Sequence, residues 1–364
     1  MQPRAHKYAS QNAKDDWLKR LSAVRIITII FIALGYASTM PEGPASSEML
    51  SHLGYQPSWI GIQILFFFSG VLALRSVQAG RIGWRYLKSR FQSVAPYLIA
   101  FTLITTCIIY PVFTQVETIP LSTLGLYFLE TVTCVNPGQQ LPGLLDNAAY
   151  ACLIQGSIWT LKWGLLFHIT IAVMGRFRAL FNPSFLAFAA LMATLIYGVT
   201  TYLAVKSQWE HLVPYLTALR LGYAFTLGMA IWANRHRLPN SPSVKLILLF
   251  AFLGLSFSKF AFGPWSPVIE VSLCLFWGYL AWLLAMSKGN ALNWLSDWPR
   301  LAAPLYMINW PAAQIMLMLV PDLDPQTLPM VSIPISLVLT AMSYKIFQSS
   351  LRFKIEPKAP LFAR

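Results

Sequence analysis

Residues 58–75 read SWIGIQILFFFSGVLALR, with no charged side chain before the final arginine. About 20 mostly apolar residues suffice for an α-helix to cross the hydrocarbon core of a bilayer. Pro57 stands before this run, where a helix can begin, and Arg75 stands at its end, where a membrane surface would receive the charge. The stretch therefore predicts a membrane-spanning helix.

Similar runs recur along the whole chain, and they decide the fold class. The sequence has 364 residues, of which 56% are hydrophobic and 11% are charged, whereas an ordinary soluble domain has about 25% charged residues. We expect an all-α polytopic membrane protein of about ten transmembrane helices. Its transmembrane domain covers residues 21–347, between a cytoplasmic N-terminal segment, 1–20, and a cytoplasmic tail, 348–364. The expected spans are 21–40, 58–75, 94–112, 157–175, 184–203, 214–233, 245–262, 267–287, 301–320 and 329–347.

The basic residues indicate the orientation of the chain. The net charge is +14, but the lysines and arginines fall in short clusters that follow every second span. This pattern is typical of cytoplasmic loops, which are rich in Lys and Arg, and it argues against a nucleic-acid partner. It predicts that both termini lie in the cytoplasm and that the acid-bearing segments lie outside.

The long outer segment 113–156 contains the apolar stretch LSTLGLYFLETVTCV, which is too short to span a bilayer comfortably. We expect an interfacial or re-entrant helix there. Cys134 and Cys152 share this segment, and the sequence leaves open whether they form a disulfide. No Cys/His spacing in the chain is typical of a metal site.

Three basic residues fall inside expected spans: Arg25, Lys162 and Arg220. A charge inside a membrane costs several kcal/mol unless it is paired or hydrated, so such residues usually face a protein cavity. Long basic side chains near the end of a span can instead extend to the membrane surface. Both readings stay open for each of the three.

Five stretches, in order along the chain, resemble segments of the acyltransferase-3 family of membrane acyltransferases. The first has an arginine, ten intervening residues and then a position that the family fills with histidine. The fourth resembles the Gly-Ser-x-Trp-Thr-x-x-x-Glu helix of members that act on exported polysaccharides, and the fifth resembles a Tyr-x-x-His-Trp-Pro segment. The stretches are LSAVRIITIIFIALGYAS, ILFFFSGVLALRS, RYLKSRFQSVAPYL, GSIWTLKWGLLFHI and APLYMINWPAAQI.

The resemblance implies that an acyl group, often acetyl, moves from a cytoplasmic acyl-CoA to a sugar beyond the membrane. Acyl-CoA would be a co-substrate, no cofactor would stay bound, and the acceptor would be an extracytoplasmic polysaccharide or glycolipid. The family pattern places the protein in the bilayer of a bacterial inner membrane. Arg25 matches the family's arginine at the cytoplasmic mouth, and Arg75 and Arg90 match basic positions that suit the phosphates of CoA.

The sequence departs from the family at three ionisable positions. Tyr36 stands where the family has its histidine, Gly164 stands where it has glutamate, and Asn309 stands where it has a second histidine. The first histidine is thought to be the base that activates the acceptor hydroxyl, a task that suits imidazole because its pKa lies near neutrality. A phenol, with a pKa of about 10, is a poor base at neutral pH.

Other residues are candidates to replace the lost groups. Tyr36 and His168 are the candidate catalytic residues, with Tyr36 as a base or as a hydrogen-bond donor to the acyl carbonyl. Further pocket candidates are Lys162, Trp159, Gly164, Asn309 and Trp310.

Two other functions stay open. The protein could be a catalytically inactive relative that binds an exopolysaccharide and assists a polysaccharide synthase or exporter. It could also be a transporter unrelated to acylation, but no pair of broken helices in matching halves of the sequence favours this reading.

Overall fold

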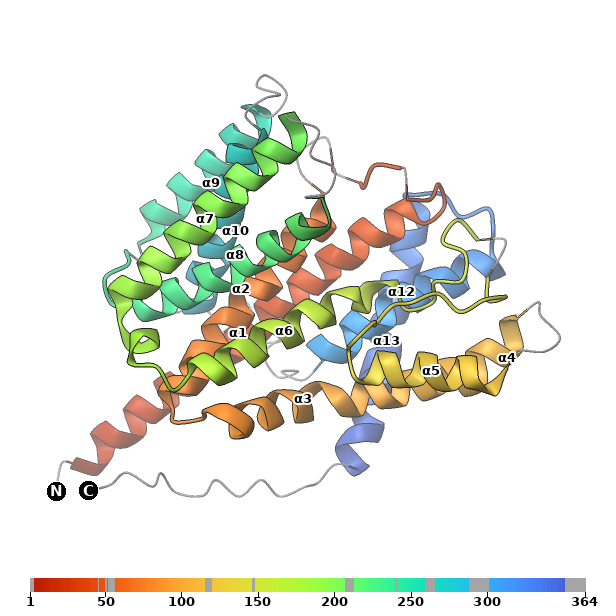
Figure 1. Ribbon diagram of the computed structural model, residues 1–364, viewed down its shortest axis with the longest axis horizontal. Helices are drawn as coiled ribbons and strands as arrows, with labels where there is room; N and C mark the ends of the chain where they lie inside the picture. The colour runs from red at the N-terminus through yellow and green to blue at the C-terminus, as the bar shows by residue number, and fades with distance from the viewer. Residues whose placement is uncertain are drawn as a thin grey trace.

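The computed structural model describes most of the chain as helices joined by short connections (Figure 1). The expected tail lies almost wholly outside the described residues, and nothing tests its location. The described residues are 3–44, 46–49, 51, 56–114, 120–145, 148–206, 213–239, 241–258, 266–287 and 301–350.

The described residues contain no β-strand, and the all-α prediction is confirmed over them. Their single β-type pairing is an isolated bridge between Thr114 and Leu144. The α-helices are α1 (Pro3–Thr39), α2 (Pro57–Gln78), α3 (Gly83–Ile104), α4 (Tyr110–Phe113), α5 (Leu121–Val132), α6 (Leu161–Met174), α7 (Pro183–Lys206), α8 (Val213–Ala233), α9 (Pro242–Ser258), α10 (Ser266–Met286), α12 (Ala302–Leu319) and α13 (Thr327–Ser350).

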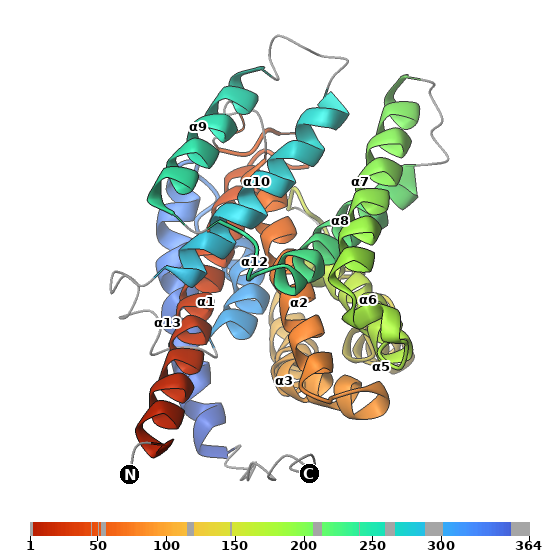
Figure 2. The same cartoon turned by 90° about the vertical axis from the view of Figure 1, so that its left-hand side faces the viewer.

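Seven helical segments among the described residues are long and apolar enough to cross a membrane, so the chain is an integral membrane protein by its helix lengths and composition. Three further expected spans coincide with α9, α10 and α12, and a total of ten crossings stays a prediction. The start of α1 and the end of α13 lie at the same end of the helix bundle in both views (Figures 1 and 2). The seven segments are Trp17–Thr39, Pro57–Gln78, Gly83–Phe113, Gly156–Met174, Pro183–Ala204, Tyr215–Ala233 and Thr327–Lys345.

The third span is longer than the sequence pattern predicts. We expected it to begin at residue 94, but α3 begins at Gly83, so the basic segment before Pro96 is part of the same helix. A π-helical turn, Thr105–Ile109, then joins α3 to α4 without a break. The basic segment misled the prediction because hydropathy marks where a helix enters lipid, not where the helix starts. The expected short helix is present as α5, which packs along α3, and its location on the outer side stays a prediction.

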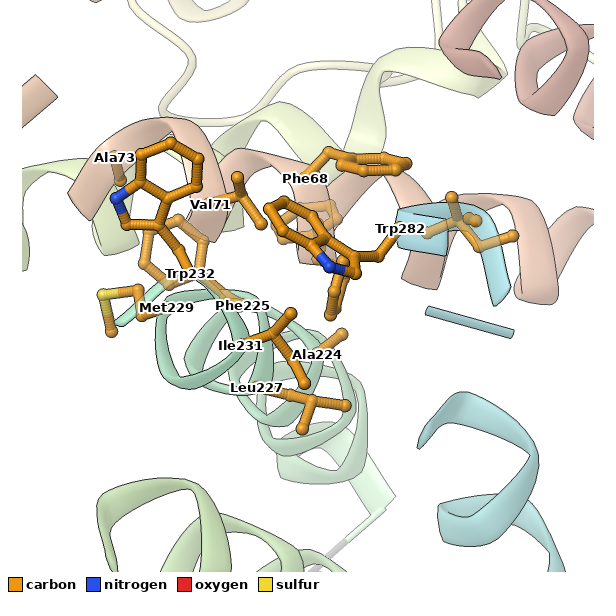
Figure 3. Packing of buried hydrophobic residues seen from close by; sticks show 14 of the residues in the cluster. Phe68, Val71, Ala73, Ala224, Phe225, Leu227, Met229, Ile231, Trp232 and Trp282 are labelled. Atoms are coloured by element: carbon orange, nitrogen blue, oxygen red, sulfur yellow. The ribbon is translucent and has the colours of Figure 1, made fainter. Parts of the chain in front are cut away.

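The core of the bundle is the contact between α2 and α8 (Figure 3). A Cβ atom on Gly70 would overlap the carbonyl oxygen of Phe225, and one on Gly228 would overlap that of Phe67. The two helix backbones therefore touch directly, as small residues allow in membrane proteins. This contact fixes the position of Ser69, which precedes Gly70 on α2.

A tryptophan cluster marks the end of the bundle at which the apolar part of α1 begins. The ring of Trp17 lies 5.3 Å from that of Trp232 and 6.4 Å from that of Trp282, centroid to centroid. The guanidinium of Arg75 lies 5.0 Å from the centre of the Trp17 ring, and that of Arg235 lies 4.3 Å from the Trp232 ring. Aromatic and basic residues are typical of membrane–water boundaries, which places this end near one surface of the bilayer.

Candidate functional site

The residues expected to act together fall into two groups, one around the 3₁₀ turn that precedes α6 and one around His168 of α6. The aromatic cluster consists of Tyr36, Trp59, Tyr150, Trp159 and Trp310. The arginine–histidine cluster consists of Arg25, Ser69, Tyr86, Arg90 and His168.

The aromatic cluster is centred on Tyr36. Its hydroxyl oxygen accepts a hydrogen bond from Nε1 of Trp159 at 3.3 Å, and its ring meets that of Trp310 edge-on at 4.9 Å. Tyr150 packs against the other side of Trp310 at 5.1 Å, and Trp59 packs against Trp159 at 5.7 Å. Three of the expected site residues, Tyr36, Trp159 and Trp310, are therefore in direct contact.

A 3₁₀ turn, η3 (Gly156–Thr160), explains why the Gly-Ser-x-Trp-Thr spacing builds this cluster. Side chains three residues apart point the same way in a 3₁₀ helix. Ser157 donates to the backbone oxygen of Tyr306 at 2.8 Å, and the hydroxyl of Thr160 lies 2.9 Å from that of Tyr306. Gly156 lies against the Trp310 ring with no room for a Cβ. The glycine, serine and threonine thus dock the turn on α12 and leave Trp159 facing Tyr36.

Asn309 lies on α12 beside this contact and is buried, with 3% of its surface exposed. Its amide nitrogen donates to the backbone oxygens of Leu305 at 3.1 Å and Tyr306 at 2.7 Å. Its amide oxygen is buried and has no hydrogen-bond partner among the described residues. A buried acceptor left unpaired costs about 1–3 kcal/mol, so this oxygen is available to a ligand's hydrogen-bond donor.

Glu48 is a residue of this region that the sequence analysis missed. Its carboxylate is buried and accepts hydrogen bonds from the backbone nitrogen of Ser58, at 2.8 Å, and from the Ser58 hydroxyl. Gly35 makes room for it, because a Cβ there would overlap the carboxylate oxygen. Burial raises the pKa of the Glu48 carboxyl, and the hydrogen bonds from Ser58 partly oppose this rise.

Glu48 is close enough to the aromatic cluster to interact electrostatically with Tyr36 and Tyr150. The region around Tyr36 therefore has a carboxyl group, even though the glutamate position of the related helix holds Gly164. The sequence did offer one signal: Glu48 lies ten residues before Ser58, which is in the first turn of α2, and carboxylates favour helix N-termini. That signal is weak because many outer-loop acids are simply solvated.

The arginine–histidine cluster joins four helices. On α6, His168 has Nδ1 at 2.6 Å from the Tyr86 hydroxyl of α3 and Nε2 at 3.2 Å from the Ser69 hydroxyl of α2. The guanidinium of Arg90 lies 5.3 Å from the Tyr86 ring centre and donates to the backbone oxygen of Leu72 at 2.6 Å. Its charge also acts on His168 and on Arg25 of α1.

One donor of this cluster is unsatisfied. Nε of Arg90 is buried and has no hydrogen-bond partner among the described residues. Two guanidinium groups near each other inside a membrane protein also repel, unless an anion or water offsets their charges. The cluster is therefore built to accept an anionic or hydrogen-bond-accepting group.

Gly164 separates the two clusters. Thr160, Gly164 and His168 follow one another at four-residue intervals, so they lie on the same side of the helical segment. Thr160 is held by Tyr306 and His168 by Tyr86, whereas a Cβ on Gly164 would meet no atom within 4 Å. Gly164 thus borders open space, whereas the positions one turn before and after it, Thr160 and His168, are in contact with other side chains.

The two candidate bases do not share a site. Thr160 and His168 are eight residues apart, which is about 12 Å along an α-helix. Tyr36 contacts Trp159, the neighbour of Thr160, whereas His168 belongs to the arginine–histidine cluster. His168 therefore lies in a different site from Tyr36.

Two other expected site residues lie outside both clusters. Lys162 is exposed, and its ammonium lies 5.3 Å from the Trp163 ring centre. Arg75 lies over Trp17 at the membrane boundary, not beside Arg25 and Arg90. Arg220, in contrast, joins the aromatic cluster, because its guanidinium stacks 4.3 Å from the Trp59 ring centre and its Nε donates to the Tyr197 hydroxyl at 2.8 Å.

Cys134 and Cys152 are not joined, so the disulfide that the sequence left open is not formed. Burial raises the pKa of the Cys134 thiol to about 11, which makes it a poor nucleophile near neutral pH. Among the residues that the structure describes, no group of three His, Cys, Asp or Glu side chains could hold a metal ion.

Comparison of the chain with protein-family models, with curated proteins and with solved structures finds no match. A function therefore has to be inferred from the geometry of the two clusters.

Proposed function

We propose that the protein is a membrane acyltransferase that takes an acyl group, such as acetyl, from cytoplasmic acyl-CoA and transfers it to an extracytoplasmic polysaccharide or glycolipid. The observation that carries this proposal is the pair of clusters, one at the η3 turn and one at His168 of α6, with open space at Gly164 between them. One cluster is cationic and the other is aromatic. A reaction that transfers an acyl group from an anionic donor to a sugar acceptor needs one binding site of each kind.

The arginine–histidine cluster suits the donor. CoA carries phosphates, which arginine binds with a fork of parallel hydrogen bonds. Arg25 and Arg90 bring two positive charges together, and the unpaired Nε of Arg90 supplies a donor that is already desolvated. An anion between these groups would relieve their repulsion, so donor binding would be favoured by the same charges that are costly in the empty protein.

The aromatic cluster suits the acceptor. Trp59, Trp159 and Trp310 offer flat apolar faces for sugar rings, and the unpaired oxygen of Asn309 can accept a hydrogen bond from a sugar hydroxyl. The Tyr36 oxygen already accepts the Trp159 N–H. Its own hydroxyl hydrogen stays available to donate, so Tyr36 fits a hydrogen-bonding role better than a role as a base.

The test of this proposal is donor binding to the purified full-length protein, measured with labelled acetyl-CoA. We expect saturable binding, and we expect Arg90→Ala to weaken it about tenfold or more, since a hydrogen bond to a charged group contributes about 1.5–3 kcal/mol. Arg237→Ala is the matched control, because Arg237 is exposed and belongs to neither cluster. Absence of binding by the wild-type protein would refute the proposal.

A second candidate function is a glycan-binding protein without catalysis, the partner of a polysaccharide synthase or exporter. The observation in its favour is that Tyr36, Gly164 and Asn309 are all neutral where related enzymes have ionisable groups. This function predicts that the protein binds a polysaccharide through the aromatic cluster and neither binds nor consumes acetyl-CoA. The same binding measurement therefore separates the two functions.

A further inference from the structure

The hydroxyl of Ser69 meets an imidazole, whereas several other hydroxyls in these helices bond to their own backbone. Thr28, Thr102 and Thr201 each donate to the backbone oxygen four residues earlier in their own helix, as hydroxyl side chains commonly do. The Ser69 hydroxyl instead lies 3.2 Å from Nε2 of His168, which belongs to another helix. Ser69 is also partly exposed, whereas Phe68 and Gly70 on either side of it are buried.

The second nitrogen of His168 is held as well. Nδ1 lies 2.6 Å from the hydroxyl of Tyr86, and the imidazole ring packs edge-on between Tyr86 and Phe225. When Nδ1 carries the hydrogen and donates it to the Tyr86 oxygen, Nε2 is free to accept from Ser69. A hydroxyl, a base beside it and a third group that orients the base are the arrangement by which proteins activate a serine as a nucleophile.

The packing makes this arrangement rigid. Gly70 brings α2 against the backbone of Phe225 on α8, which fixes the depth and rotation of Ser69. Arg90, on the same helix as Tyr86, is tied to the Leu72 backbone of α2. The nucleophile, the base and the orienting hydroxyl are therefore held by contacts among α2, α3, α6 and α8.

We propose that Ser69 is a catalytic nucleophile that carries the acyl group as a covalent ester during the reaction. This inference rests on the proposed function, because the donor is the same acyl-CoA thioester. Oγ of Ser69 attacks the thioester carbonyl, and Nε2 of His168 takes its proton. The carbon–sulfur bond then breaks, and His168 returns the proton to the departing CoA thiolate, so that CoA leaves as the free thiol.

The second half of the reaction uses the same groups. An acceptor hydroxyl reaches the ester by way of the open space at Gly164, which lies one helical turn from His168. His168 takes the proton of that hydroxyl, the new ester bond forms, and the proton passes to Oγ as the bond to Ser69 breaks. The partly exposed position of Ser69 thus lets its hydroxyl meet the acyl-CoA held by the arginine–histidine cluster first, and lets the resulting ester meet the acceptor at Gly164 afterwards.

The experiment is to trap the ester. Full-length protein in detergent or nanodiscs is incubated briefly with labelled acetyl-CoA without an acceptor, quenched in acid, and examined by intact mass and by peptide mapping. We expect one acetyl group on the peptide that contains Ser69. Ser69→Ala should bind acetyl-CoA and carry no label. Ser69→Cys should retain a label that neutral hydroxylamine removes, because a thioester replaces the ester.

The other variants separate catalysis from folding. His168→Gln should slow labelling about 100-fold or more, the range for loss of a general base. Tyr86→Phe should slow labelling without changing the affinity for acetyl-CoA, as expected of a residue that positions His168. Ser76→Ala, two turns further along α2, should label as the wild-type protein does.

The outcomes are distinguishable. If acetyl-CoA binds and is hydrolysed or its acyl group is transferred, but Ser69 is never labelled, the covalent step is refuted and the proposed function stands. Labelling that persists in Ser69→Ala likewise refutes the covalent step at Ser69 alone. If acetyl-CoA does not bind at all, the proposed function and this inference are both refuted.

Discussion

The aromatic cluster and the arginine–histidine cluster are held together in different ways. The aromatic cluster depends on a local sequence motif, since Gly156, Ser157, Trp159 and Thr160 lie within one 3₁₀ turn that docks on α12. The arginine–histidine cluster depends on four helices, α1, α2, α3 and α6, and its side chains meet across the contacts between these helices. A local motif should fail through one substitution within it, whereas the second cluster should fail when the helices that carry it move apart. Substitutions that act on one cluster at a time test this difference.

Gly70→Ala should have the largest effect, because it separates α2 from α8. The added Cβ would overlap the Phe225 carbonyl oxygen, and the resulting strain and backbone shift should cost about 1–3 kcal/mol or more. We expect a lower melting temperature in detergent, together with loss of acetyl-CoA binding as Ser69 moves from His168. Gly254→Ala is the control, since a Cβ there meets no described atom within 4 Å. Full donor binding in Gly70→Ala would contradict the prediction.

Gly156→Ala should disable one cluster and spare the other. Its Cβ would overlap the Trp310 ring and push that ring away from Tyr36. We expect weaker glycan binding and an altered tryptophan fluorescence spectrum, with acetyl-CoA affinity unchanged. If the two activities fall together, the clusters are not independent.

Arg25→Ala and Arg75→Ala should have different effects on donor binding, although both arginines were expected to bind the donor. Arg25 lies within electrostatic range of Arg90, whereas Arg75 lies over Trp17 at the membrane boundary. We expect Arg25→Ala to weaken acetyl-CoA binding about tenfold, and Arg75→Ala to leave binding unchanged while reducing thermal stability slightly. Titration calorimetry on both variants measures this difference, and equal loss of affinity would mean that the donor extends to the Trp17 boundary.

Glu48→Gln should change how stability depends on pH. The folded protein raises the pKa of Glu48, so between the unfolded and folded pKa values the folded state binds more protons than the unfolded state. Stability therefore rises as the pH falls through this window and declines as the pH rises through it. Glutamine keeps one oxygen to accept from the Ser58 backbone N–H, its amide nitrogen can donate to the Ser58 hydroxyl oxygen, and it cannot ionise, so the variant should lose this contribution to the pH slope. Melting curves from pH 4 to pH 8 measure it, and an unchanged slope would refute the role of Glu48.

Gly164→Ala should have the smallest effect. A Cβ there meets no atom within 4 Å, and alanine favours a helix over glycine by up to about 1 kcal/mol. We expect equal or slightly higher stability and unchanged donor binding. Gly164→Leu should also bind the donor but should slow acyl transfer, because its side chain would occupy the space between the clusters. Unimpaired transfer by the leucine variant would show that the space is not used.

The sequence predicted the helices better than it predicted the site. Apolar runs bounded by proline located the expected spans within a few residues of observed helices, because burial in lipid imposes a long, uninterrupted pattern. The starts of α1 and α3 were missed, because α1 begins at Pro3 instead of residue 21 and α3 at Gly83 instead of residue 94, and the first turns of both helices are polar or basic. Tyr36, Trp159 and Trp310, which the resemblance offered as site candidates, are in contact in the structure, and their role stays a prediction.

The pairing of His168 with Ser69 and the burial of Glu48 could not be predicted in this way. Each depends on how one helix is rotated and how deeply it lies relative to another, which periodicity along a single helix does not specify. Lys162 shows the converse, since an unusual residue in an apolar run lies on the exposed side. Whether a charged residue within a span faces the protein or the outside depends on how its helix is rotated about its axis, and only the contacts between helices show that rotation.

The π-helical turn at Thr105–Ile109 has a consequence for how α4 meets the 141–155 connection. It places one extra residue in an otherwise continuous helix, and an α-helix advances about 100° per residue. This offset allows Thr105 to meet Gln155 at 2.9 Å while Tyr110 donates to the Pro142 oxygen at 3.1 Å. Deleting one residue within the turn would restore a regular helix but would swing Tyr110 away from the 141–145 loop. The π-helical turn thus rotates α4 relative to α3, so that one continuous helix can contact both Gln155 and the 141–145 loop.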